Sequence, residues 1–563
     1  MNRFLISVCA LLFAVGGVYA QSTQVKNAAK SAFKLIGYDA NGTEISSTCG
    51  VFVSADGEAI GSWSALSTAA NAVVTDFNGK TYPVQKLIGA NEIYDVCHFK
   101  VGAQKVQAAT LAKSILPKDS KVWLVGSESK KPTATEYEIE REEKFMDQYA
   151  YYVLAFRDSQ GIPGSPVVNS KGEVVGLFQS APSAVDARFA ANLKFDALTI
   201  NNPLYANSGI RMQLPSEKKD AQLMVMFAAD KGDSAKYAGY IADYISQFPY
   251  DVDGYSMDAL RRVNYGDYDG ADKQMQTALK QVTNKAEAHS EYSRVMYQKL
   301  IFSNDSLYKP WTFDRAYVEA EKAYKLDPQP AYKHRMAQIL YSKAEYQKAY
   351  DLFEELTKSS ISNSEVFFEA AQCKTQLGAS NEEIIVLLDS AVARCPQPYT
   401  TVSAPYILTR GQLRDAMKNY RGALADYNTY DTIMVGRASA DFYYTRYKCE
   451  VNLRQYQQAL NDIAHAAFVA HPDMRPVYLA ELASLQLRVN RFEDAIRTAD
   501  LCLSVDNSST DALVIKGVAL NAIKRKAESA ECFKKAAELG DKRGDEYLKK
   551  YSLKKSVFLF NSL

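Results

Sequence analysis

A repeat with a period close to 34 residues runs through the second half of the chain and constrains its fold more than any other feature. Small or apolar residues recur in pairs seven positions apart, and the first members of successive pairs are separated by 34, 45, 33, 35, 39, 36, 36 and 34 residues. These pairs are Tyr237/Tyr244, Ala271/Ala278, Ala316/Ala323, Ala349/Leu356, Ile384/Ala391, Ala423/Tyr430, Ala459/Ala466, Ala495/Cys502 and Ser529/Ala536. Residues seven apart lie on one face of an α-helix, where small side chains let a neighbouring helix approach closely. The pattern therefore predicts stacked helix pairs that depend on their neighbours to bury an apolar face.

Aromatic residues keep the same phase, three positions before the first small residue of a pair. They are Tyr268, Phe313, Tyr346, Tyr420, Tyr456 and Phe492. Together with prolines after several second helices, this pattern resembles the tetratricopeptide repeat, a 34-residue helix–turn–helix unit, in eight or nine copies over residues 213–550. The step of 45 residues indicates an inserted loop near residues 303–311.

The resemblance implies a superhelix whose concave groove is lined by the first helix of each unit. Carrying the family's phase over to this sequence gives six inward-facing candidates for binding a protein or peptide partner. They are His334, Arg335, Gln338, Glu369, Tyr444 and Lys448. Ordinary solvated helix surface is the alternative interpretation of each. No repeated set of lysine and asparagine appears among them, so a ligand held by its C-terminal carboxylate is not indicated.

Residues 31–207 follow a different pattern, with short β-type runs separated by Asn-Gly, Asp-Gly and Lys-Gly turns. Many short strands at regular spacing predict a barrel or a sandwich. One run carries acidic residues at alternate positions, which predicts four carboxylates on one solvated face of a strand. These residues are Glu136, Glu138, Glu140 and Glu142.

Three motifs in this half occur in the order and rough spacing of the HtrA-type, trypsin-like serine proteases. They are residues 53–57 (Val-Ser-Ala-Asp-Gly), residues 94–96 (Tyr-Asp-Val), and residues 161–169 with the following strand–turn–strand to 177. The last is the most specific, because family members carry Gly-x-Ser-Gly-Gly/Ser-Pro followed by two strands. The resemblance implies two six-stranded antiparallel β-barrels within residues 21–212, with the reactive groups in the cleft between them.

Catalysis in this family requires a serine nucleophile, a histidine base, an aspartate and two backbone N–H donors for the oxyanion. At the matching positions this sequence has Pro163 for the serine, Ser64 for the histidine, and a retained Asp95. Proline supplies neither a hydroxyl nor an N–H, so one oxyanion donor is also expected to be missing. We therefore expect a pseudoprotease with no catalytic residues.

Two other residues bear on that expectation. Ser165 is the only candidate for a shifted nucleophile. His98 is the only histidine between residues 21 and 213. It follows Asp95 by three positions on the same predicted strand, so the two side chains are expected on opposite faces. A packed histidine that does not pair with Asp95 is the prediction.

Residues 1–20 have the pattern of a secretory signal peptide, with Arg3 before an apolar stretch and small residues near Ala20. Export is therefore expected, to a periplasm or to the exterior. Without Arg3 the chain has 65 basic and 65 acidic residues, which argues against an electrostatic nucleic-acid binder. Seven cysteines remain, of which Cys49 and Cys97 either form a disulfide or stay separate thiols.

No phosphate-binding, dinucleotide-binding or metal-ligating motif occurs, so neither a cofactor nor a metal is expected. No later apolar stretch is long enough to span a membrane. The predicted organisation is a signal peptide (1–20), a trypsin-like double β-barrel (21–212), an all-α array (213–550) and a C-terminal tail (551–563).

The expected function is an exported, non-enzymatic scaffold that binds a protein or peptide partner through the groove, with the inactive barrel as a docking module. One alternative is a secreted serine endopeptidase with an active site rewired around Ser165 and an array that recruits substrate. A carbohydrate-uptake component is a third possibility, suggested only by the 37 tyrosines.

Overall fold

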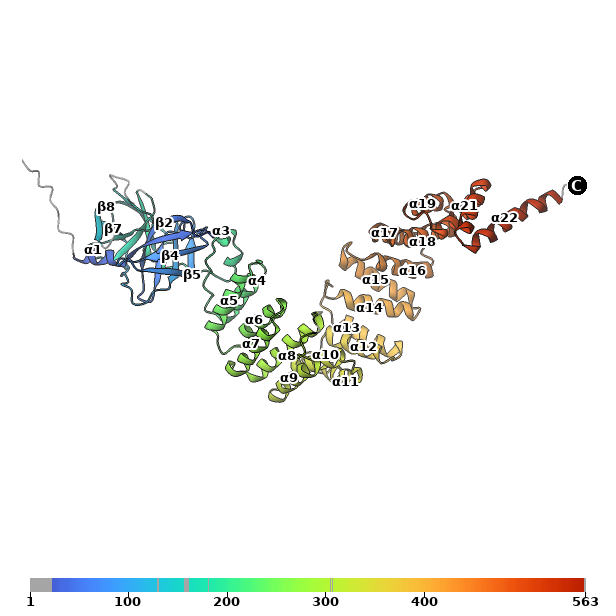
Figure 1. The fold of residues 1–563 in the computed structure, drawn as a ribbon, viewed down its shortest axis with the longest axis horizontal. Helices are drawn as coiled ribbons and strands as arrows, with labels where there is room; N and C mark the ends of the chain where they lie inside the picture. Colours follow the sequence, from blue (N-terminus) through green and yellow to red (C-terminus); the bar gives the residue numbers. More distant parts are fainter. Residues whose placement is uncertain are drawn as a thin grey trace, which may run out of the picture. The chain divides into compact units, whose positions relative to one another are not determined.

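The computed structural model describes residues 23–560, apart from residues 129–130, 156–160, 181, 304 and 306. The expected signal peptide, residues 1–20, lies outside the described residues. The chain divides into two compact units, residues 1–284 and 285–563. Strands occupy the blue to cyan part of the chain in Figure 1, and helices follow from green to red.

The first barrel has the strand order β1-β2-β3-β6-β5-β4, and the pairing of β1 with both β2 and β4 closes it. Its strands are β1 (Ala32–Tyr38), β2 (Glu44–Phe52), β3 (Glu58–Gly61), β4 (Asn71–Thr75), β5 (Thr81–Asn91) and β6 (Val96–Val101), preceded by α1 (Thr23–Ala28) and η1 (Ala29–Ser31). Aromatic rings fill the interior, where the ring of Phe33 lies 4.6 Å from that of Phe52 and 6.1 Å from that of Phe99. Closure leaves no unpaired strand edge, and the packed rings make the barrel a core rather than a pore.

The second barrel has the order β10-β11-β12-β9-β8-β7 and closes through β10 and β7. Its strands are β7 (Lys121–Glu128), β8 (Lys131–Phe145), β9 (Tyr149–Leu154), β10 (Pro166–Val168), β11 (Val174–Phe178) and β12 (Ser183–Asp186). A short helix, α2 (Ala187–Asn192), follows, and the Asp186 carboxylate caps it by accepting a hydrogen bond from the Arg188 amide. The prediction of two six-stranded antiparallel barrels is confirmed.

Strand β8 departs from the sequence prediction in one detail. Its pairing with β9 shifts register between Ile139 and Arg141. A bulge of this kind inserts one residue and reverses the facing of the residues beyond it. The prediction of four carboxylates on one exposed face is therefore wrong for Glu142, which is half-buried, whereas Glu136, Glu138 and Glu140 are exposed.

The connecting segment, residues 193–214, returns from the second barrel to the first before the helices begin. It contains η2 (Thr199–Asn201) and α3 (Pro203–Ala206). Its end runs beside β5, where the amide of Leu87 donates to the carbonyl of Arg211 at 2.8 Å and the amide of Gln213 donates to the carbonyl of Leu87 at 2.6 Å. The first unit then continues with two helical hairpins, α4 (Lys218–Ala229) with α5 (Ser234–Gln247) and α6 (Val252–Asn264) with α7 (Tyr268–Gln281).

The second unit consists of helices that pack on their neighbours in sequence. They are α8 (Lys285–Phe302), α9 (Phe313–Leu326), α10 (Pro330–Ser342), α11 (Tyr346–Leu356), α12 (Ser364–Gln376), α13 (Asn381–Ala393), α14 (Ala404–Ala416), α15 (Tyr420–Met434), α16 (Ala440–Asn452), α17 (Tyr456–Val469), α18 (Arg475–Arg488), α19 (Phe492–Val505), α20 (Thr510–Ala522), α21 (Lys526–Glu538) and α22 (Lys542–Phe560). The last helix extends into residues 551–563, which we set apart as a tail. The loop expected near residues 303–311 lies between α8 and α9, with the Trp311 side chain buried in it.

The residues seven apart lie on the second helix of each hairpin and are buried, apart from Tyr237 and Tyr430, which are half-buried. Several hairpins turn through a residue with a left-handed backbone. These turn residues are Ala344, Lys418, Arg454, Asn490 and Lys524, with φ between 58° and 68°. The prediction of an all-helical C-terminal region is confirmed, and its burial pattern is consistent with the repeat. Across residues 23–560, leaving aside the undescribed gaps, no helix is long and apolar enough to cross a membrane.

Candidate functional site

Asp95 lies in a turn just before β6, with a left-handed backbone at φ 45°. The prediction that it shares a strand with His98 is therefore wrong, because β6 begins at Val96. Because Asp95 lies in a turn, its side chain does not follow the alternating directions of strand residues, and its carboxylate reaches the segment that follows β3.

The Asp95 carboxylate binds the segment that carries Ser64. Its Oδ1 accepts a hydrogen bond of 2.6 Å from the Ser64 amide, and its Oδ2 accepts one of 2.7 Å from the Ser62 hydroxyl. The Ser62 and Ser64 hydroxyl oxygens lie 2.7 Å apart, and Ser64 is exposed while Ser62 is buried. Both carboxylate oxygens are thus engaged by the turn at residues 62–64.

The loop that carries Pro163 comes from the second barrel and packs against the first. The amide of Cys49 donates a 2.8 Å hydrogen bond to the carbonyl of Pro163. Gly164 has φ 83°, and a Cβ there would stand 2.0 Å from the Cys49 carbonyl oxygen and 3.1 Å from the Ser62 nitrogen. The fold therefore brings the three residues predicted at the family's triad positions, Ser64, Asp95 and Pro163, to one junction between the barrels.

Ser165 is held within this loop by its backbone. Its amide donates to the carbonyl of Ile162 at 3.1 Å, and its carbonyl accepts from the amide of Phe178 at 2.9 Å. The residue is only 4% exposed. A serine in this position is enclosed by the barrel wall.

His98 is buried in the first barrel. Its Nδ1 lies 3.3 Å from the Leu193 carbonyl oxygen, and its Nε2 lies 3.5 Å from Glu58 without the geometry of a hydrogen bond. Burial, ahead of the other influences, lowers the pKa of the imidazole. Within the part of the chain that the structure describes, its polar neighbours are thus Leu193 and Glu58 rather than Asp95.

Cys49 on β2 and Cys97 on β6 are separated by β3 in the first barrel and form no disulfide. All seven cysteines of residues 23–560 are recorded as thiols. The Cys97 thiol is fully buried and donates to the carbonyls of Gly61 and Ser62, at 3.5 and 3.4 Å. Burial, with a smaller contribution from the Asp95 charge, raises the pKa of this thiol well above its usual range.

Four of the six groove candidates form one polar network across α10 and α12. Glu369 accepts a hydrogen bond from Gln338 at 2.8 Å, and its other carboxylate oxygen lies 2.5 Å from Nε2 of His334. Arg335 donates to the Gln338 side-chain oxygen at 2.8 Å and lies over the ring of Tyr297 at 5.3 Å. A cavity of about 280 Å³ adjoins this network, lined by residues of α8, α10, α11 and α12 that include Gln338, Glu369 and Tyr297.

The other two candidates lie together on α16. The ammonium of Lys448 stands 4.6 Å from the ring centroid of Tyr444. Tyr444 stacks on Tyr447 at 5.7 Å and meets Tyr478 of α18 edge-on at 5.4 Å. Two of these tyrosines are anchored by acids, because Tyr447 donates to Glu481 at 3.2 Å and Tyr478 donates to Asp441 at 2.6 Å.

Sequence reasoning did not single out Tyr297, Tyr447 or Tyr478, which complete these two clusters. Tyr447 stands twelve residues before Ala459, where the hairpins of α14 and α20 have Gly411 and Gly517. Tyr447 could have been identified from this signal, a large aromatic residue at a position where two other repeats carry glycine.

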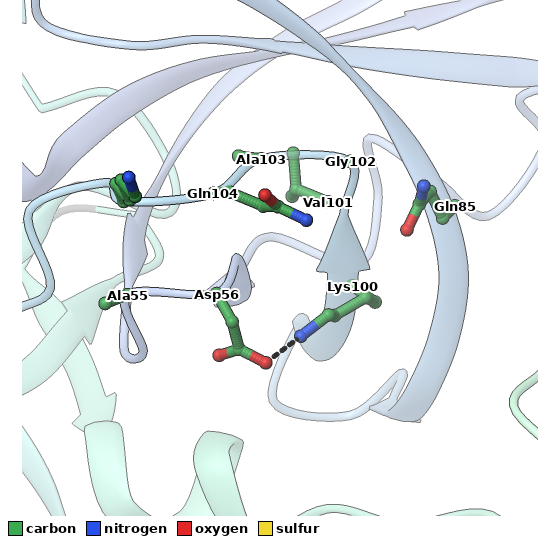
Figure 2. Close-up of a pocket in the computed structure, with 9 residues that line it drawn as sticks. Ala55, Asp56, Gln85, Lys100, Val101, Gly102, Ala103 and Gln104 are labelled. Carbon is green, nitrogen blue, oxygen red and sulfur yellow. Dashed lines mark hydrogen bonds and ion pairs between the residues drawn. The ribbon is translucent and has the colours of Figure 1, made fainter.

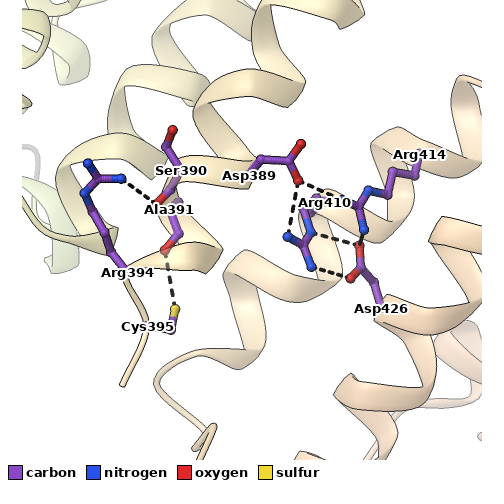
Figure 3. Close-up of polar contacts among 8 residues, drawn as sticks. All are labelled: Asp389, Ser390, Ala391, Arg394, Cys395, Arg410, Arg414 and Asp426. Carbon is purple, nitrogen blue, oxygen red and sulfur yellow. Dashed lines mark hydrogen bonds and ion pairs between the residues drawn. The ribbon is translucent and has the colours of Figure 1, made fainter. Parts of the chain in front are cut away.

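The arginines of α14 are neutralised within the array. Arg410 and Arg414 both bind Asp426 of α15 and Asp389 of α13, at distances between 2.6 and 3.2 Å. Figure 3 shows the two guanidinium groups between these two carboxylates. Their exposure is low, at 16% and 21%, and they act as a link between three helices.

A separate recess of about 580 Å³ lies on the first barrel, between the turn at Ala55 and Asp56 and residues 101–105. Figure 2 shows Lys100 paired with Asp56 at its base and the amide of Gln85 at its edge. None of the three family positions lines it. Across the described ranges, no group of three or more His, Cys, Asp or Glu side chains could hold a metal ion.

The double-barrel part of the chain matches a known protein family. Residues 48–177 match the family model described as a trypsin-like peptidase domain. Among solved structures, the chain is similar to "HtrA-type protease AlgW with tripeptide", with 17% sequence identity and a TM-score of 0.27. That match covers 32% of this chain and 62% of the other, so this chain spans less than two thirds of its length. No curated protein sequence gives a match. The family match, the two closed barrels and the order of the motifs together identify residues 48–177 as a trypsin-like peptidase domain, followed by an all-helical C-terminal region.

Proposed function

We propose that the double barrel of this chain is not a working peptidase. The observation that carries the proposal is Pro163, which stands where the family has its serine and offers neither a hydroxyl nor an N–H. Ser64 at the histidine position cannot act as a base near neutral pH, and Asp95 holds the backbone of the turn instead of an imidazole. His98 is buried beside Leu193 and Glu58, so no imidazole is supplied from elsewhere in the first barrel.

A casein-cleavage assay on the mature chain tests this proposal. The native chain is expected to cleave casein no faster than the Ser165→Ala variant. This variant is the matched control for the alternative in which Ser165 is the nucleophile of a serine endopeptidase. Cleavage by the native chain that Ser165→Ala abolishes would establish the serine endopeptidase instead.

We further propose that residues 21–212 form the barrel module, that residues 213–550 form a tetratricopeptide array, and that the array binds a polypeptide partner. Support comes from the two clusters of groove candidates, at Glu369 and at Tyr444. Each joins aromatic and charged side chains from neighbouring first helices. Aromatic and arginine side chains are the residues that most often dominate binding energy at protein interfaces. The same proposal includes export after cleavage behind Ala20, which N-terminal sequencing of the mature protein tests.

Co-purification from the native envelope tests the groove. The partner recovered with the native chain is identified by mass spectrometry and then measured against purified variants. Simultaneous Tyr444→Ala and Lys448→Ala is expected to weaken its binding about tenfold. Tyr250→Ala with Lys534→Ala is the control, because both residues are exposed and lie outside the first helices of the second unit. Equal binding by both double variants would contradict a role for this face.

A further inference from the structure

A cavity of about 270 Å³ lies in the first unit, where the connecting segment meets the α4–α5 hairpin. Most of its wall is apolar and buried. That wall includes Ile200, Ile210, Met212, Ala228 and Tyr240. One side is charged and is formed by Lys231, Asp233 and Lys236. Neither the family's catalytic positions nor the groove candidates line it.

Hydrogen bonds hold the walls in place. The hydroxyl of Tyr240 accepts from the amide of Met212 at 3.0 Å, which ties α5 to the connecting segment. The hydroxyl of Tyr205 donates to the carbonyl of Ala90 at 3.1 Å, and its ring packs edge-on against Trp63 at 5.4 Å. These two hydrogen bonds fix the positions of both tyrosines in the cavity wall. A wall fixed in this way needs little reordering to accept a ligand.

Lys236 is the polar group best placed to fix a ligand. Its ammonium donates one hydrogen bond, of 2.7 Å, to the carbonyl of Ser208 and retains two further N–H donors. Among the residues the structure describes, no carboxylate pairs with it. Burial, more than any other influence, lowers the pKa of Lys236, and Arg211 lowers it further while Asp233 opposes them. An anion beside this ammonium would relieve the penalty of its burial.

The charges around the cavity also favour an anion. Arg211 lies outside the lining but acts on the charge of Lys236, and it shares the Asp243 carboxylate with Lys86, at 3.2 and 3.1 Å. Lys231 adds an exposed ammonium at the rim. Asp233 is the acid of the lining, and its Oδ1 already accepts from the Lys236 amide at the start of α5. Among the described residues that line the cavity, Lys231 and Lys236 are cations and Asp233 is the acid, so the lining carries more positive than negative charge.

We propose that this cavity binds a carboxylate carried on a small apolar body, with the acid on the Lys236 ammonium and the body against Ile200 and Met212. The volume is just under the range of about 300–1,000 Å³ typical of drug-sized ligands. It limits the occupant to a small free acid or to the C-terminal residue of a polypeptide. Either source supplies the same chemistry, a charge-assisted hydrogen bond beside a buried apolar contact.

Isothermal titration calorimetry on the full mature chain tests the proposal with two matched pairs of probes. The first pair is 4-phenylbutyrate and 4-phenylbutyramide. The second is N-acetyl-glycyl-phenylalanine and its C-terminal amide. At least one acid is expected to bind about tenfold more tightly than its own amide, the difference expected for one hydrogen bond to a charged group. The pair that shows the preference identifies the source of the carboxylate.

Four variants locate the effect. Lys236→Met is expected to lower the affinity for the acid to that for the amide. Lys236→Arg is expected to keep the tighter binding of the acid. Lys219 is an exposed lysine on α4, and Lys219→Met is expected to leave both affinities unchanged. Ala228→Leu, which fills the cavity from α4, is expected to weaken the acid and the amide alike. Should Lys236→Met fail to fold by circular dichroism, Lys236→Arg and Ala228→Leu still decide the question. Any one of four results would overturn the proposal. For the native chain, these are the failure of both acids to bind and an equal affinity for acid and amide. For the variants, they are a preference for the acid that survives Lys236→Met and unchanged binding in Ala228→Leu.

Discussion

The amide of Ser64 donates a 2.6 Å hydrogen bond to the carboxylate of Asp95. In a working triad this carboxylate would orient a histidine ring through the ring's N–H. Here its two oxygens bind the backbone of Ser64 and the hydroxyl of Ser62. Asp95, which the sequence predicts at the aspartate position of the family, therefore has a structural part in this chain as the acceptor that fixes the turn after β3.

This relationship predicts different outcomes for two substitutions of Asp95. Asp95→Ala leaves the Ser64 amide without its acceptor and the buried Ser62 hydroxyl with only the Ser64 hydroxyl as a partner, and it is expected to lower the free energy of unfolding by about 2 kcal/mol. Asp95→Asn keeps one carbonyl acceptor and tolerates the left-handed backbone, so about half that loss is expected. Chemical denaturation of the barrel measures both. An unchanged stability in Asp95→Ala would contradict the structural part assigned to the carboxylate.

Gly164 is expected to be intolerant of a side chain. Its φ of 83° disfavours any other residue, and a Cβ would also stand 2.0 Å from the Cys49 carbonyl. Gly79 has nearly the same φ, 82°, with nothing within 4 Å of a Cβ, and so serves as the matched control. Gly164→Ala is expected to destabilise the barrel pair by about 2 kcal/mol more than Gly79→Ala. Thermal unfolding of the two variants measures the difference, and equal losses would argue against the tight junction between the barrels.

A buried ion pair joins the two helices of the hairpin formed by α16 and α17. Arg446 donates two hydrogen bonds to Asp462, at 2.6 and 2.9 Å, and both side chains are about nine-tenths buried. Asp462→Ala leaves that guanidinium with only part of its counter-charge and is expected to lower stability by about 3 kcal/mol. Glu538→Ala breaks the exposed pair with Lys534 and is expected to cost less than about 0.5 kcal/mol. Urea denaturation compares them, and a small loss in Asp462→Ala would contradict this account.

Glu450 predicts a pH dependence of stability. It is buried on α16, its Oε2 has no partner among the described atoms, and burial together with the Asp462 charge raises its pKa from 4.5 to about 8. The folded chain therefore holds this proton more tightly than the unfolded chain. The stabilisation is fully present below about pH 4.5 and is lost as pH rises toward 8.

Glu450→Gln removes this titration. Its stability relative to the native chain is expected to improve as pH rises from 4.5 to 8, by a total on the order of 3 kcal/mol. Urea denaturation at several pH values measures the difference, with Glu538→Gln as an exposed control that shows no such trend. A constant offset between Glu450→Gln and the native chain would show that Glu450 does not titrate in this window.

The helical array was predictable because its signal is local and repeated. Small residues such as Ala459 and Ala466 lie seven apart on a single helix, and the structure buries both. The same phase placed His334 and Glu369 on successive first helices, where the structure joins them. Periodicity specifies which face a residue occupies, and neighbouring repeats then bring equal faces together.

Irregular backbone was harder to predict. The strand pattern of the sequence predicted Asp95 and His98 on one strand, but Asp95 has a left-handed backbone and lies in the turn before that strand. Alternation also failed at Glu142, where a bulge changes the facing of β8. The cavity at Lys236 was out of reach altogether, because its walls come from the connecting segment and from α4 and α5, which only tertiary packing brings together.

Labelling with a fluorophosphonate probe tests the central claim most directly, since the probe reacts only with an activated serine. The pseudoprotease that we propose predicts no labelling of the native mature chain, because a proline at the position predicted for the nucleophile offers neither a hydroxyl nor an N–H. An active trypsin-like protease in the same reaction confirms the probe, and Ser165→Ala identifies the site of any signal. Labelling of the native chain that Ser165→Ala abolishes would contradict the account and show that the barrel is a serine peptidase.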